Sequence, residues 1–262
     1  MIVAGLVLLA VGAADLVRQF APRRWIGYLT VAVILLLLGS VSDALIPMIA
    51  ALIVGALWVW CMPSDRPAPL GFWPAVLLGA LSIGAVVWAG ARTDAGLIGE
   101  IWTLRSPFGD VPFDLAVLAL GAGAFLLESA NLVVRAALDG EHTWRPADPA
   151  PEVVAPVAAT GEEGEIADGA EEDATPIRDP RSGFKGGRLI GPLERVLVMI
   201  LTLAAAYPIL AAMLAAKGIV RFPEISRDGE TGARAEYFLV GSLVSWVIGL
   251  GAAFLVWWAA HS

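Results

Sequence analysis

Seven apolar stretches constrain the fold of this chain more than any other feature of its sequence. Each approaches the roughly 20 residues that an α-helix needs to cross about 30 Å of hydrocarbon. The stretches are about Ile2–Leu16, Trp25–Ser40, Ala44–Met62, Trp73–Ala91, Val111–Val133, Leu189–Ala215 and Tyr237–Ala259. Because lipid offers the backbone no hydrogen bonds, a spanning stretch must satisfy its own peptide groups, as a helix does. The sequence therefore predicts an all-α, polytopic integral membrane bundle of about seven transmembrane helices.

Composition excludes a soluble globular domain. Of the 262 residues, 58% are hydrophobic and 16% are charged, whereas a soluble domain has about half apolar and a quarter charged residues. The single cysteine, Cys61, excludes an intrachain disulfide and a cysteine metal site. The two histidines, His142 and His261, make a histidine-based zinc site or catalytic triad unexpected. We therefore predict no metal, no cofactor and no nucleic-acid partner.

The first apolar stretch has two interpretations. Small residues at Ala10–Ala14 are typical of the end of a signal peptide. A signal peptide also has a basic segment before its apolar core, and here the positive charges follow the apolar run instead. We expect Ile2–Leu16 to be a retained anchor.

Residues 139–187 form a polar segment of a different composition, rich in Pro, Ala and Glu. Its acidic run contains Glu162, Glu163, Glu165, Asp168, Glu171, Glu172 and Asp173. With almost no aromatic residues, it cannot bury enough apolar surface to offset the entropy of ordering. We predict a disordered cytoplasmic linker, with a docking segment for a basic partner as the alternative. It separates a five-span unit, residues 1–138, from a two-span unit, residues 188–262.

The distribution of Lys and Arg predicts the orientation. Arg18, Arg23 and Arg24 follow the first stretch and Arg66 follows the third. A further group lies between the fifth and sixth stretches: Arg135, Arg145, Arg178, Arg181, Lys185 and Arg188. Cytoplasmic connections carry an excess of these residues. We expect a multi-pass protein of the bacterial cytoplasmic (inner) membrane, with its N-terminus outside and its C-terminus and acidic linker in the cytoplasm.

Charged residues inside two of the stretches mark a candidate site. Glu128, Asn131 and Arg135 are spaced by three and four residues, so they share one helix face. Arg188, Glu194 and Arg195 enter the sixth stretch from the same surface. At 1.5 Å per residue, Glu128, Glu194 and Arg195 lie at matching depth, roughly 10 Å in.

This spacing predicts that Glu128 pairs with Arg195 or Arg188, with Asn131 as a bridge. One interpretation is a buried ion-pair network that fixes helix register. The other is a site for an anionic head group, a solute or a proton near the inner leaflet.

Two further features concern the C-terminal spans. Lys217, Arg221 and Glu236 belong to a charged group that we place on the opposite, outer face, as an interfacial turn. Tyr207-Pro208 predicts a kink inside the sixth span. Gly241, Ser245 and Gly249 recur every four residues, which favours close helix packing.

Several segments resemble a family of bacterial multispan membrane proteins of unknown function. They are Leu127–Arg135, Gly187–Arg195, Leu214–Lys217, Arg221–Phe222 and Ala235–Gly241. The string Gly-Arg-x-Ile-Gly-x-Leu-Glu-Arg at Gly187–Arg195 is the most specific of them, although Pro192 departs from the pattern and is expected in the first helical turn. The resemblance covers roughly residues 127–241 and implies a membrane location without an activity.

Two classes of function remain open. The first is a non-enzymatic accessory or assembly subunit of a larger inner-membrane complex, with a protein partner. The second is a small transporter or a protein that binds anionic lipid or a solute through the charged cluster. A membrane enzyme with Glu128 or Glu194 as general base is a third reading, but the sequence assigns no catalytic residue.

Overall fold

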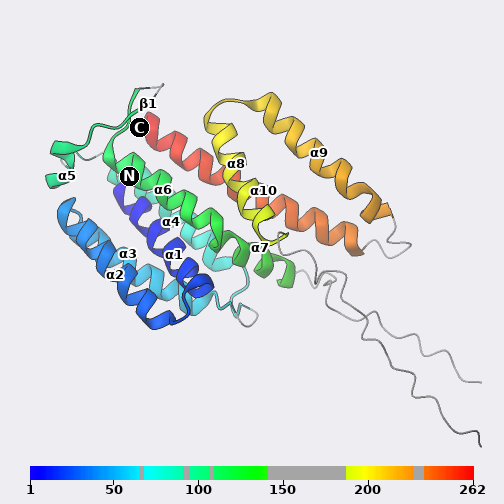
Figure 1. Ribbon diagram of the computed structural model, residues 1–262, viewed down its shortest axis with the longest axis horizontal. Coiled ribbons are helices and arrows are strands. Elements are labelled where there is room, and N and C mark those ends of the chain that lie inside the picture. Colours follow the sequence, from blue (N-terminus) through cyan, green and yellow to red (C-terminus); the bar gives the residue numbers. More distant parts are fainter. Residues whose placement is uncertain (65–67, 91, 93–94, 107–108, 141–186, 227–232) are drawn as a thin grey trace, which may run out of the picture.

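The computed structural model describes residues 1–64, 68–90, 92, 95–106, 109–140, 187–226 and 233–262 (Figure 1). Its described part is all-α apart from one two-stranded ribbon. The helices are α1 (Ile2–Phe20), α2 (Arg24–Val41), α3 (Leu45–Cys61), α4 (Trp73–Ala89), α5 (Gly96–Ile101), α6 (Phe113–Leu127), α7 (Ser129–Gly140), α8 (Gly187–Leu203), α9 (Tyr207–Ser226) and α10 (Ala233–His261). The ribbon pairs β1 (Arg105–Ser106) with β2 (Gly109–Asp110). The predicted linker lies outside the described residues over 141–186.

Three of the described helices are long and apolar enough to cross a membrane: α1, α2 and Glu236–His261 within α10. A fourth is added if α6 and α7 count as one bent span. The apolar helices Leu45–Cys61, Trp73–Ala89 and Tyr207–Val220 are shorter. The predicted number of seven spans is therefore not confirmed. Large side chains such as Trp88 (89% exposed) and Ile46 (81% exposed) point outward, as expected of helices with an apolar surrounding.

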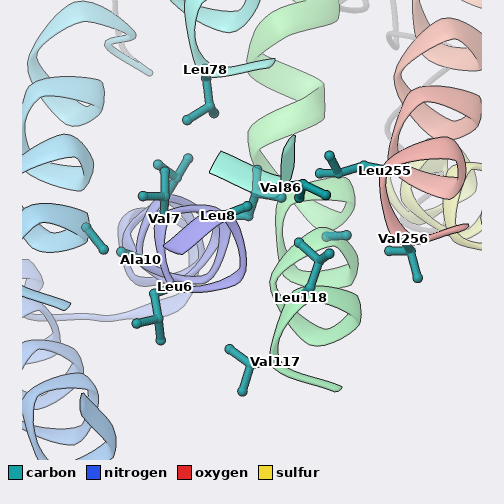
Figure 2. Close-up of a cluster of buried hydrophobic side chains, with 14 of the residues drawn as sticks. Leu6, Val7, Leu8, Ala10, Leu78, Val86, Val117, Leu118, Leu255 and Val256 are labelled. Atoms are coloured by element: carbon teal, nitrogen blue, oxygen red, sulfur yellow. The ribbon is translucent and has the colours of Figure 1, made fainter. Parts of the chain in front are cut away.

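The first helix lies at the centre of the bundle. α1 packs against α6, α3, α4 and α2, and it supplies Leu6 and Val11, neither of which is exposed. Figure 2 shows part of the core that forms around it, with labelled side chains Leu6, Val7, Leu8, Ala10, Leu78, Val86, Val117, Leu118, Leu255 and Val256. This core joins α1 to α4, α6 and the end of α10.

Glycines allow α1 and α6 to approach at backbone distance. A Cβ atom on Gly5 would lie 2.8 Å from the Leu118 nitrogen, and one on Gly12 would lie 2.6 Å from the Ala124 carbonyl carbon. A Cβ atom on Gly121 would collide with the Gly5 carbonyl oxygen. Small residues bring helices together in this way where apolar solvent leaves packing as the main attraction.

The predicted sixth span is two helices rather than one. α8 ends at Leu203, α9 begins at Tyr207, and Figure 1 shows the chain reversing direction between them. Ala205 takes a positive φ of 53°. The Ala206 amide donates to the Leu201 carbonyl at 2.9 Å and the Ala205 amide to that of Thr202 at 3.1 Å. These two bonds form a Schellman motif, which terminates a helix.

Prolines near the two helices fit this arrangement differently from the prediction. Pro208 occupies the first turn of α9, where its missing N–H is tolerated, so it starts a helix instead of kinking one. Pro192 lies inside α8 rather than in its first turn, because that helix already begins at Gly187.

The bundle has two ends, which we name from the chain. At the linker face, α7 ends at Gly140 and α8 begins at Gly187. At the terminal face lie Met1 and the C-terminus, which Figure 1 shows near each other beside α5 and β1. The Met1 amino group donates to the Gly90 carbonyl, at the end of α4, at 2.8 Å. The C-terminal helices are packed onto the N-terminal bundle through α10, which contacts α8, α7, α6 and α4.

Candidate functional site

Two polar clusters flank the contact between α8 and α10, one toward the junction of α6 and α7 and the other toward α9. The Arg195 cluster consists of Glu128, Asn131, Arg195, Ser245 and the carbonyl of Leu126. The Glu194 cluster consists of Glu194, Lys217 and Trp246, with the ring of Phe238 beside them.

A bend in the backbone supplies acceptors to the Arg195 cluster. α6 and α7 meet at Glu128 with axes 47° apart. The backbone amide of Asn131 donates to the Glu128 carbonyl, three residues earlier, at 2.9 Å. Asn131 Nδ2 donates to the Leu127 carbonyl at 3.3 Å, and Arg195 Nε donates to the Leu126 carbonyl at 3.1 Å. These side chains satisfy carbonyl groups at the bend, and an unsatisfied carbonyl in an apolar surrounding is costly.

Arg195 donates from all three of its side-chain nitrogens. Nε bonds the Leu126 carbonyl, Nη1 bonds Ser245 Oγ at 3.3 Å, and Nη2 bonds Asn131 Oδ1. Asn131 Nδ2 in turn donates to Glu128 Oε2 at 3.2 Å. The whole residue is only 2% exposed. The guanidinium is therefore occupied by internal acceptors, and Asn131 links it to the Glu128 carboxylate.

Glu194 is held by partners on two other helices. Lys217 Nζ on α9 lies 2.8 and 2.7 Å from the two carboxylate oxygens, and Trp246 Nε1 on α10 donates to Oε1 at 2.8 Å. The Lys217 ammonium also lies 5.6 Å from the centroid of the Trp246 ring and 5.8 Å from that of Phe238. The aromatic faces add cation–π attraction to the ion pair.

Neighbouring residues on α8 belong to different clusters, and so do neighbouring residues on α10. Glu194 and Arg195 are neighbours on α8, and their partners Trp246 and Ser245 are neighbours on α10. Consecutive helical residues point about 100° apart. The two α8 side chains therefore diverge, one toward α9 and the other toward α6 and α7. This arrangement fixes the position of α8 relative to all of its neighbours.

The sequence prediction holds for part of the set. Asn131 bridges Glu128 and Arg195, as expected. Arg135 does not join them: it is exposed, and its Nη2 donates to the Pro63 carbonyl at 3.3 Å. Arg188 lies in the first turn of α8, and its side chain is outside the described part.

The predicted outer-face group requires a correction. Lys217 was expected at the face opposite Glu194, but it bonds that carboxylate directly. The reversal between α8 and α9 brings it back to the same level. Arg221 lies further along α9, and its side chain is not among the described ones. Glu236 is exposed near the start of α10.

Ser245 and Trp246 are the site residues that sequence reasoning missed. Ser245 was assigned only to a small-residue packing face. That face packs closely at Gly249, where an added Cβ atom would lie 3.3 Å from Val198 Cγ1, and less closely at Gly241, where it would make an ordinary contact 3.7 Å from Leu138 Cδ1. A hydroxyl beside an indole N–H in an apolar helix was the available signal, since both groups need partners when buried.

Two further ion pairs tie the bundle together at its two ends. Near the linker face, Arg18 bonds Asp15, three residues earlier on α1, at 2.7 Å and also the Met62 carbonyl at 2.8 Å. At the terminal face, Arg92 bonds the Asp114 carboxylate at 2.8 and 3.1 Å and the Ser42 carbonyl at 3.0 Å. Both arginines join separate helices through carbonyl groups at helix ends, where cations are favoured.

Within the described residues, no three His, Cys, Asp or Glu side chains gather as metal ligands. Comparison with protein-family models, with curated proteins and with solved structures finds no match for this chain. What the site can do must therefore be inferred from its geometry.

Proposed function

We propose that this chain is a non-enzymatic integral membrane component, an accessory or assembly subunit of a larger complex in the bacterial inner membrane. The two polar clusters then serve as locks that hold α8, α9 and α10 against the N-terminal bundle. The partners would be membrane lipids and at least one other membrane protein.

The hydrogen bonding and burial of Arg195 are the main support for this proposal. Its three nitrogens donate to internal acceptors while the residue is 2% exposed. At this degree of burial the guanidinium is shielded from solvent, and each of its three nitrogens already donates one bond to the protein. Removing an acceptor from such a buried charge is costly, whereas the bonded charge adds little net stability, so we assign Arg195 the role of specifying one arrangement of helices.

Gentle extraction of the tagged protein from its own membrane, followed by mass measurement of the intact complex, tests the proposal. We expect a stoichiometric protein companion. Arg195→Met should reduce recovery of that companion, because the helices that depend on the lock shift or unfold. Arg135→Met, which alters an exposed arginine of the same region, should leave recovery unchanged. A protein recovered alone from its native membrane contradicts the proposal.

The bend between α6 and α7 favours a second candidate function, transport or binding of a small solute or anionic lipid. Broken helices in a membrane are tolerated where they line a polar site. Ser129, at this bend, is fully buried, and its hydroxyl has no hydrogen-bond partner among the described residues. That hydroxyl could serve a bound molecule.

Substitution of Ser129 separates the two functions. An accessory subunit should tolerate Ser129→Ala, because that change removes an unpaired hydroxyl and keeps the shape. A binding or transport protein should lose retained lipid or solute in the same mass measurement while keeping its fold. Retention of a small molecule by the wild type and its loss in Ser129→Ala would favour the second function.

A further inference from the structure

The direction of α10 determines which end of the bundle holds the C-terminus. Near its start, Gly241 faces Leu138 at the end of α7, by the linker face. Further along, Gly249 faces Val198. Close to its end, Leu255 belongs to the same buried cluster as Val86 of α4, which α10 contacts (Figure 2). α10 therefore runs from the linker face to the terminal face.

The reversal between α8 and α9 makes this direction necessary. α8 leaves the linker face, and α9 returns far enough for Lys217 to bond Glu194. A continuous sixth span would instead have delivered the chain to the terminal face before the last helix. With the reversal, Met1 and Ser262 share one face whether the α8–α9 hairpin crosses the membrane fully or only enters it.

The faces defined in this way differ sharply in positive charge. Of the 17 Lys and Arg residues, chain order assigns Arg92 and Arg105, between α4 and α6, to the terminal face. Those in or next to connections at the linker face are Arg18, Arg23, Arg24, Arg66, Arg135, Arg145, Arg178, Arg181, Lys185, Arg188, Arg221, Arg227 and Arg234. Arg195 and Lys217 are held inside the two clusters. Such a bias near helix ends sets orientation across a membrane.

We infer that the linker face lies in the cytoplasm against anionic phospholipid head groups, and that both described ends of the chain lie on the outer side. This revises the expectation of a cytoplasmic C-terminus. Arg23, Arg24 and Arg135 are exposed at the linker face, where cations near an anionic leaflet are attracted to its head groups. The inference does not depend on the proposed function.

Because the chain has a single cysteine, Cys61, one substitution gives a cysteine-free background for site-specific labelling. In a Cys61→Ser background, one cysteine at a time is introduced by Ser262→Cys, Thr103→Cys or Thr160→Cys in the full chain. Bacteria expressing each variant are treated with a membrane-impermeant maleimide before and after permeabilisation. We expect Ser262→Cys and Thr103→Cys to react in intact cells, and Thr160→Cys to react only after permeabilisation.

Each other pattern overturns part of the inference. If Ser262→Cys behaves like Thr160→Cys, the ends lie on different sides and the reversal of α9 is contradicted. If Thr160→Cys alone reacts in intact cells, the assignment of the basic face to the cytoplasm is contradicted. As a second measurement, alkaline phosphatase fused after Ser262 should be active, because its disulfides form outside the cytoplasm. An inactive but stable fusion counts against the inference.

Discussion

Two helix–helix contacts, the seam between α1 and α6 and the seam between α8 and α10, are held together by different chemistry. α1 and α6 meet through glycines, so close that a single added Cβ would collide with backbone. α8 and α10 meet through the hydrogen bonds of Arg195 with Ser245 and of Glu194 with Trp246. Where helices lack a hydrophobic drive to associate, both close packing and hydrogen bonds hold them together. The first seam should be sensitive to added volume and the second to a lost partner.

The largest effect is expected at Arg195. Arg195→Met leaves the Leu126 carbonyl and Asn131 Oδ1 without their donor, and each buried acceptor left unsatisfied costs roughly 1–3 kcal/mol. Denaturant titration in detergent micelles measures the free energy of unfolding. Arg135→Met is the matched control, and its change should stay within about 0.5 kcal/mol. Equal effects of the two substitutions would contradict the lock.

The Glu194 cluster should show energetic coupling between α8 and α9. Glu194→Gln and Lys217→Met each break the pair, so the double variant should lose less stability than the sum of the two, by roughly 0.5–3 kcal/mol. The same titration measures this coupling. Glu236→Gln, at an exposed carboxylate of α10, should combine additively with Lys217→Met. If Glu194→Gln and Lys217→Met were also additive, the Glu194–Lys217 pair would contribute nothing to the free energy of unfolding.

The glycine seam is probed by two glycines of the same helix. Gly121→Ala forces a Cβ atom onto the Gly5 carbonyl and should destabilise the protein by about 1–3 kcal/mol. Gly123→Ala has nothing within 4 Å of its new Cβ atom, and alanine is the better helix former, so it should be neutral or slightly stabilising. Thermal unfolding midpoints in micelles compare them. A reversed order would refute the packing of α1 on α6.

The smallest effect concerns the turn that separates α8 from α9. Ala205 adopts a positive φ, which for alanine costs about 1 kcal/mol relative to glycine. Ala205→Gly should therefore stabilise the protein by about that amount. Ala204→Gly, one residue earlier in the same turn, should not. Destabilisation by Ala205→Gly would favour a continuous helix through this position.

The sequence predicted those features that local spacing controls. The all-α class follows from the apolar runs, and the bridging Asn131 follows from residues three and four apart on a helix. The reversal at Ala205 could not be predicted in this way. An apolar run of this length fits either one long helix or two short ones, and the turn has no glycine at its left-handed position. Because the sequence analysis expected one continuous span there, it placed Lys217 on the wrong face.

Residues that depend on distant helices were also beyond sequence reasoning. Ser245 and Trp246 became site residues only because α10 runs antiparallel to α9 and beside α8. Arg92 and Asp114 likewise meet across the loop before α6. Patterns within one helix name the polar residues, but the chain's path through the bundle decides which of them become partners.

A double-mutant cycle between Asn131 and Arg195 tests most directly whether the Arg195 cluster is an internal lock. Asn131→Ala, Arg195→Met and the double variant are compared with the wild type by denaturant titration in micelles. Their direct hydrogen bond predicts a coupling of about 1–3 kcal/mol. Effects that add to within about 0.5 kcal/mol would contradict the lock, because independent sites behave in that way.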